Sequence, residues 1–101
     1  MDLTYHPAAE DEIEEAIAWY EADYPGRGRR FIDAFDATAL RVRATPHTSP
    51  TWRRRRDVRF AVVPRFPYSI VFRIESSAVM VYAVAHHKRR PGYWRDRLRN
   101  G

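Results

Sequence analysis

Apolar residues recur at helical spacing through the first half of the chain, in two runs. The first run is Ile13, Ala16, Ile17, Tyr20 and Tyr24, and the second is Phe31, Ile32, Phe35, Ala39 and Val42. This period of three to four residues predicts helices over residues 8–24 and 28–44. Pro25 and Gly26 separate the two helices, and a turn this short predicts an antiparallel helical hairpin.

The second half of the chain has the alternating pattern of strands. Strands are predicted over residues 58–63, 68–74 and 78–85, with connections short enough for antiparallel neighbours. Residues 45–51, TPHTSPT, are predicted to form a loop because they are rich in proline and hydroxyl side chains.

Two shorter elements complete the predicted fold. Residues 3–6 form a strand candidate that ends at Pro7, and residues 93–98 form a helix candidate after Pro91 and Gly92. The predicted class is α+β, with a single domain over residues 1–101. It consists of an N-terminal strand, a helical hairpin packed on one face of a small, mainly antiparallel sheet, and a short C-terminal helix.

Alternation along each strand also assigns side chains to the two faces of the sheet. The sets expected beneath the helices, because burial of large apolar groups stabilises a fold, are Val58, Phe60, Val62 and Ile70, Phe72, Ile74. Arg59 and Arg73 are then expected together on the uncovered face. In the last strand either alternating set fits beneath the helices. If the smaller set of Val79, Val81, Ala83 and Ala85 lies there, His86 joins the two arginines.

Charge is divided unevenly along the chain. Residues 1–26 carry −8 and residues 27–101 carry +13, which gives the net charge of +5. Seventeen of the 18 bases are arginine, which suits phosphate and carboxylate better than lysine does, although a GC-rich genome also favours arginine. A polyanionic partner is expected, either nucleic acid or an acidic protein.

The sequence does not predict a metal site, a disulfide or a membrane-spanning segment. It has no cysteine, and His6, His47 and His86 lack ligand spacing, so neither a metal site nor a cofactor is expected. The N-terminus lacks the pattern of a signal peptide, and no apolar run approaches the roughly 20 residues that span a bilayer. A soluble protein is expected.

Five short segments, taken together, have a familiar order and spacing. They are PAAE at 7–10, WY at 19–20, DVR at 57–59, YSIVFR at 68–73 and VAHHKR at 84–89. They resemble the RelE/ParE superfamily of type II toxin–antitoxin toxins over nearly the whole chain. The resemblance implies a small cytoplasmic toxin of the plasmid-stabilisation type, neutralised by a cognate antitoxin. It also implies that the toxin contacts operator DNA only as part of its complex with the antitoxin.

The resemblance leaves two molecular targets open. RelE-like members cleave mRNA at the ribosome without metal, whereas ParE-like members inhibit DNA gyrase. For cleavage, Arg59 and Arg73 are expected to stabilise the phosphate, His86 to transfer a proton and Tyr93 to assist. The residues expected to hold flanking phosphates are Arg53, Arg54, Arg55, Arg56, Lys88, Arg89 and Arg90. The first hypothesis is a ribosome-dependent mRNA endonuclease.

Three alternatives remain beside this hypothesis. Arg59 and Arg73 have a structural alternative, which is to pair with Asp57, Glu75 or acidic groups of an antitoxin. The best-known RelE-like enzymes carry lysines on and before the second strand, where this chain has arginine, a poor general base. Gyrase inhibition without catalysis is therefore the second hypothesis. The third is a module that only binds nucleic acid or a partner protein.

Overall fold

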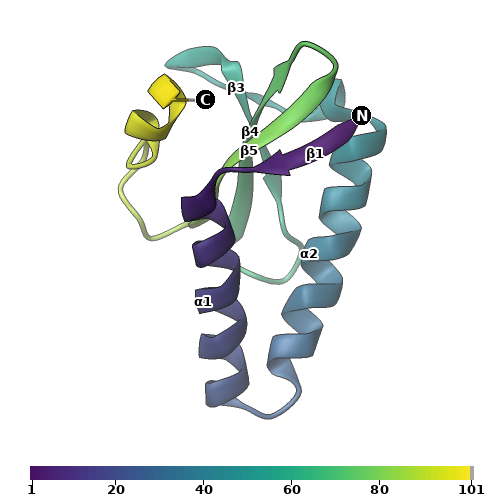
Figure 1. Ribbon diagram of the computed structural model, residues 1–101. Helices are drawn as coiled ribbons and strands as arrows, with labels where there is room; N and C mark the ends of the chain where they lie inside the picture. Colours follow the sequence, from purple (N-terminus) through teal and green to yellow (C-terminus); the bar gives the residue numbers. More distant parts are fainter. Residues whose placement is uncertain (101) are drawn as a thin grey trace.

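The computed structural model describes residues 1–100, which form a five-stranded sheet with a helical hairpin on one face (Figure 1). The elements are β1 (Asp2–Tyr5), α1 (Pro7–Asp23), α2 (Arg27–Ala44), the 3₁₀ helix η1 (Pro46–Thr48), β2 (Thr51–Trp52), β3 (Arg55–Val62), β4 (Tyr68–Glu75), β5 (Ala78–His86) and the 3₁₀ helix η2 (Arg95–Asn100). The predicted α+β class and order of the main elements are confirmed. Within residues 1–100, no helix combines the length and the apolar character that crossing a membrane requires.

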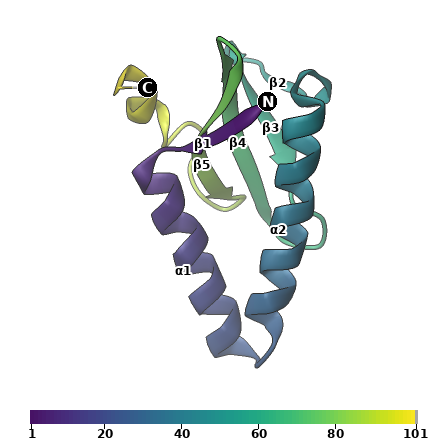
Figure 2. The same ribbon diagram turned by 45° about the vertical axis from the view of Figure 1, so that its right-hand side comes forward.

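Local sequence signals set the limits of the two long helices. His6 caps α1 by accepting a hydrogen bond from the Ala8 amide at its Nδ1 (3.1 Å), and Pro7 occupies the first turn. The turn into α2 contains Gly26 at a φ of 92°, a conformation that glycine adopts without strain. Figure 2 shows the two helices meeting at this turn and spreading apart toward the sheet.

The helices approach each other most closely beside the turn. A Cβ atom on Gly28 would lie 3.0 Å from the Ile17 carbonyl oxygen of the facing helix. Glycine at this position therefore allows the α1 and α2 backbones to approach more closely than any other residue would permit.

The sheet has the strand order β1-β5-β4-β3-β2. β1 runs parallel to β5, and the other pairs are antiparallel, as the mainly antiparallel prediction requires. The edge strand β2 lies partly in the predicted loop and was missed, because two residues are too few to show alternation. The 3₁₀ helix η1 occupies the start of that loop.

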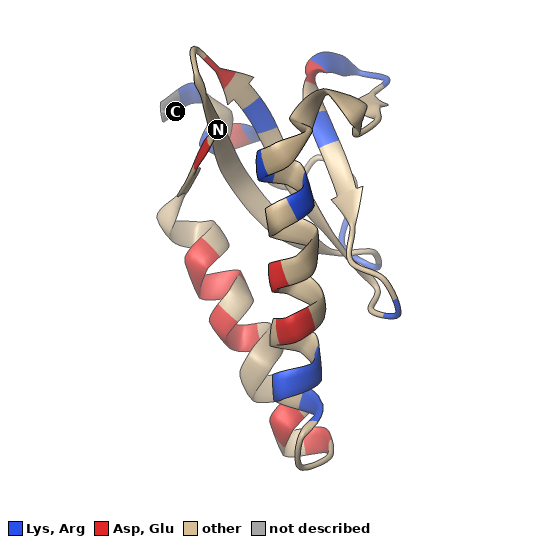
Figure 3. Cartoon of the chain, turned by 90° about the vertical axis from the view of Figure 1, so that its right-hand side faces the viewer, with Lys and Arg blue, Asp and Glu red and all other residues tan. Residues whose placement is uncertain are grey.

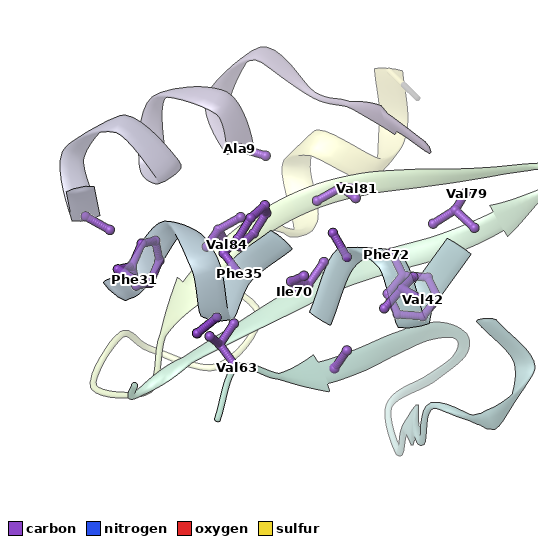
Figure 4. Close-up of a cluster of buried hydrophobic side chains, with 14 of the residues drawn as sticks. Ala9, Phe31, Phe35, Val42, Val63, Ile70, Phe72, Val79, Val81 and Val84 are labelled. Atoms are coloured by element: carbon purple, nitrogen blue, oxygen red, sulfur yellow. The ribbon is translucent and has the colours of Figure 1, made fainter. Parts of the chain in front are cut away.

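The main core lies between the helical hairpin and the sheet (Figure 4). The side chains labelled there are Ala9, Phe31, Phe35, Val42, Val63, Ile70, Phe72, Val79, Val81 and Val84. Phe31 lies at the centre of an aromatic cluster with Tyr20, Phe66 and Tyr68, at ring-centroid distances of 5.5, 5.3 and 5.3 Å. The cluster joins both helices to the turn between β3 and β4.

The opposite face of the sheet is also covered, by the C-terminal segment. Trp94 and Leu98 pack there against Val58, Val71 and Tyr82, and all five side chains are buried. The expectation of an uncovered face was therefore wrong. The cover on this side is a short 3₁₀ helix. Its few residues do not form a periodic apolar pattern, so the sequence indicated no covering layer here.

Strand β3 presents the face opposite to the one expected. Ala61 and Val63 lie in the main core, whereas Val58 and Phe60 pack with Trp52 and Trp94 on the other side. The prediction failed because each face of β3 carries buried side chains. Alternation alone therefore cannot indicate which set of side chains faces the helices.

A β-bulge in β5 changes its alternation part-way along the strand. Val71 pairs with Ala83 but Phe72 pairs with Val81, so Tyr82 is an extra residue without a partner on β4. Val79 and Val81 face the helices, and after the bulge Val84 faces them too. His86, two residues further on, consequently lies on the helical side and not beside Arg73.

Candidate functional site

Arg59 lies on the helical side of the sheet and fastens the loop after α2. Its cross-strand partner is Phe72, which belongs to the main core. The Arg59 Nη1 atom donates to the carbonyl oxygens of His47 (3.1 Å) and Ser49 (2.7 Å). The guanidinium therefore satisfies one carbonyl group in η1 and one in the loop that leads from η1 to β2.

We expect Arg59→Ala to loosen this loop and lower the free energy of unfolding by about 1–2 kcal/mol, as for loss of hydrogen bonds to a charged group. Urea unfolding measures the loss, and faster amide hydrogen exchange in residues 45–51 locates it. Arg30→Ala, which removes an exposed arginine from α2, is the matched control. Unchanged exchange in the loop would contradict this role.

Arg73 lies on the other face, in a network of acidic and phenolic groups. Its Nε donates to Glu75 (3.0 Å), Nη1 to Asp57 (3.2 Å) and Nη2 to the Tyr82 hydroxyl (3.1 Å). Only 17% of the Arg73 side chain is exposed. Burial acts to lower its pKa, but hydrogen bonds to Glu75 and Tyr82 outweigh it and raise the pKa. The structure therefore shows Arg73 paired with Asp57 and Glu75, which is the alternative to phosphate binding that the sequence left open.

The predicted convergence of Arg59, Arg73 and His86 is wrong. Phe72, the partner of Arg59, and the adjacent Arg73 point to opposite faces of β4, so the two arginines are on opposite sides of the sheet. The bulge at Tyr82 places His86 on the helical side, away from Arg73. Both guanidinium groups are already bound by protein oxygens, which leaves no shared phosphate site between them.

His86 and Tyr93 do lie together, in a cleft of about 340 Å³ between α1 and the end of β5. Trp19, Tyr20, Tyr68 and Arg89 are among the other lining residues. The pKa of His86 is lowered mainly by burial, and also by the charges of the nearby Lys88 and His87. Its imidazole is therefore neutral near pH 7. Its Nδ1 accepts a hydrogen bond from the Lys88 amide (3.0 Å).

Glu12 organises one wall of this cleft and was not singled out from the sequence. Its carboxylate accepts hydrogen bonds from the Tyr93 hydroxyl (2.7 Å) and the Val84 amide (2.9 Å), and forms a bidentate pair with Arg97 at 2.9 Å for each bond. We call these four residues the Glu12 clamp. Because 85 positions separate Glu12 from Arg97, no local spacing could have indicated the pair.

The clamp affects the acidity of Tyr93. Burial raises the pKa of its phenol, and the hydrogen bond to Glu12 and the charge of that carboxylate raise it further. Tyr93 therefore releases its proton less readily than a free phenol does. This makes it a poor proton donor for the assisting role that was predicted.

The residues predicted to hold phosphates fall into two groups. Arg53, Arg54, Arg89 and Arg90 line two adjoining hollows that share Trp52 and Pro91. Arg55 instead pairs with Asp57 (2.8 Å), while Arg56 and Lys88 are exposed. Among residues 1–100, His, Asp and Glu side chains form no group of three that could hold a metal ion.

Residues 3–91 match the family described as "ParE toxin of type II toxin-antitoxin system, parDE". The chain belongs to the ParE toxin family. The resemblance to the RelE/ParE superfamily is thereby confirmed, and the family implies a cognate antitoxin as partner.

A solved structure supports the ParE fold. It is described as "Chromosomal ParDE TA system from P. aeruginosa", with a TM-score of 0.74 and 14% sequence identity. The match covers 85% of this chain and 95% of the other. No curated protein sequence matches the chain. Tyr93, Arg95 and Arg97 follow the residues matched to the ParE family, so the Glu12 clamp joins the matched part to the segment beyond it.

Proposed function

We propose that this ParE-family toxin acts without catalysis, by binding DNA gyrase, and that a cognate antitoxin prevents this binding. The observation that carries the proposal is the separation of Arg59 and Arg73 on opposite faces of the sheet. Metal-free RNA cleavage needs positive charge and a proton acceptor at one phosphate. The arginines expected to supply that charge instead hold a loop and an acidic network. Action on gyrase would take place in the cytoplasm.

A groove beside α2 suits the antitoxin. Its volume is about 540 Å³, and its floor includes Ala34, Ala37 and Phe66. The basic residues along it are Arg27, Arg30, Arg41 and Arg65. An acidic, amphipathic segment would place apolar side chains on the floor and carboxylates against the arginines. The net positive charge of residues 27–101 adds long-range attraction for such a segment.

The test is a titration of gyrase supercoiling activity with purified toxin, alongside mRNA cleavage on programmed ribosomes. A binding inhibitor has to occupy each gyrase molecule, so we expect inhibition to rise until toxin and gyrase are roughly equimolar. Added antitoxin should restore supercoiling. Messenger RNA is expected to remain intact even with excess toxin.

An opposite pattern would overturn the proposal. Cleaved mRNA at toxin concentrations far below those of ribosomes, with normal supercoiling, would establish the endonuclease hypothesis. Loss of that cleavage in both Arg73→Ala and His86→Ala would then assign it to those residues.

A further inference from the structure

Five exposed arginines from three separate segments gather on one surface, which we call the basic patch. They are Arg53, Arg54, Arg89, Arg90 and Arg95. Within residues 1–100, none of the five forms an ion pair, in contrast to Arg55, Arg73 and Arg97. Figure 3 shows acidic residues along α1 and basic residues at the β2–β3 turn.

Two aromatic rings support this patch. Trp52 has the guanidinium groups of Arg54 and Arg95 at 5.7 and 5.1 Å from its ring centroid, and Tyr93 has that of Arg89 at 3.8 Å. A guanidinium stacked on a ring keeps its N–H groups directed outward, where they can donate to phosphate oxygens. The rings therefore hold the arginines in place rather than acting as open stacking surfaces.

Glycine at position 92 allows the C-terminal segment to complete the patch. Gly92 has a φ of 80°, and a Cβ atom there would lie 3.0 Å from the Trp52 ring. The chain after β5 thus approaches the β2–β3 turn closely enough to place Arg95 against Trp52 from another side.

The composition of the patch indicates which partner it fits. The large apolar side chains that are exposed among residues 1–100 are Met1, Trp19, Tyr24, Leu40 and Val62, none of them in the patch. A protein partner usually needs an apolar centre in its interface, and single-stranded nucleic acid needs uncovered rings on which bases stack. Unpaired arginines with covered rings instead fit a regular row of phosphates.

We infer that the basic patch binds the phosphate backbone of duplex DNA, so that the toxin contacts DNA directly and not only through an antitoxin complex. The choice of DNA over duplex RNA rests on the proposed function, because gyrase acts on duplex DNA. Such contacts are independent of base sequence. They would add to the affinity of the toxin for a gyrase molecule that already holds DNA.

The test measures binding of the full-length toxin to a labelled DNA duplex of about 20 base pairs by fluorescence anisotropy, across about 50–200 mM salt. Three to five phosphate contacts predict a slope of log K against log salt of about −2.7 to −4.5. The double variant Arg53→Gln/Arg90→Gln is expected to bind about tenfold more weakly at low salt and to reduce the slope by about 2. Circular dichroism confirms that the variant is folded.

A control pair and two competing ligands make the result decisive. Arg29→Gln/Arg43→Gln removes the same charge from exposed positions on α2 and is expected to change affinity less than about twofold. Equal losses in the two pairs would show that only net charge matters and would overturn the patch. Tighter binding of duplex RNA or of single-stranded DNA would overturn the assignment to duplex DNA. DNA binding through the patch without gyrase inhibition would reject the proposed function and leave this inference standing.

Discussion

Replacing Glu12 with alanine is expected to lower the free energy of unfolding by about 3 kcal/mol, because it leaves a partly buried cation without its partner. Only 11% of the Glu12 side chain and 18% of the Arg97 side chain are exposed. The same change removes acceptors from the Tyr93 hydroxyl and the Val84 amide. Urea unfolding followed by circular dichroism measures the loss.

A double-mutant cycle isolates the pair from these other contacts. With Glu12→Ala, Arg97→Ala and the double variant, we expect a coupling energy of about 2 kcal/mol. Glu14→Ala, which removes an exposed carboxylate from the same helix, is the control and is expected to change stability by less than about 0.5 kcal/mol. A coupling energy near zero would contradict the importance of the clamp.

Loss of the Glu12 clamp should also affect the basic patch. Glu12 holds the segment that carries Tyr93 and Arg97, and Arg95 of the basic patch lies between them. We therefore expect faster hydrogen exchange in residues 91–100 of Glu12→Ala, while α2 remains protected. Uniformly faster exchange would indicate general destabilisation instead.

Phe31→Ala is expected to destabilise the protein by about 4 kcal/mol, as for other fully buried aromatic residues. Phe31 is 0% exposed and stacks on both Tyr20 and Phe35, at 5.5 and 6.2 Å between ring centroids. Its removal leaves a cavity where α1, α2 and the β3–β4 turn meet. For a domain of about 100 residues this is a large part of the total stability. The midpoint of urea unfolding provides the measurement.

Leu40→Ala on the same helix is the control for Phe31→Ala. Leu40 is 65% exposed, so its truncation removes little buried surface and should change stability by less than about 0.5 kcal/mol. Phe31→Leu, which keeps part of the apolar volume, should fall between the two. Similar losses in Phe31→Ala and Leu40→Ala would contradict the central position of this ring.

The helices and long strands could be predicted because their signals come from near neighbours in the chain. The stripe from Phe31 to Val42 repeats every three to four residues, and the core of α2 follows it. Capping by His6 and the turn at Gly26 are equally local. β2 and the 3₁₀ character of η2 could not be predicted, because a few residues do not establish a period.

The candidate site was harder to predict because side-chain direction depends on distant partners. Arg59 faces the helical side because Trp52 and Trp94 bury Phe60 on the other side. His86 changes face because Tyr82 is an extra residue in β5. Periodicity assumes regular strands and one buried face, and both assumptions fail here.

By itself, the sequence determined the order of the main elements, the α+β class, the resemblance to the RelE/ParE superfamily and the uneven division of acidic and basic residues along the chain. Only the tertiary structure decided which of those residues meet: Glu12 with Arg97, Arg73 with Glu75, and Trp52 with Arg95. The reason is physical. Helix and strand patterns arise from neighbouring residues, whereas the faces of a sheet and its ion pairs are fixed by packing between segments far apart in the chain.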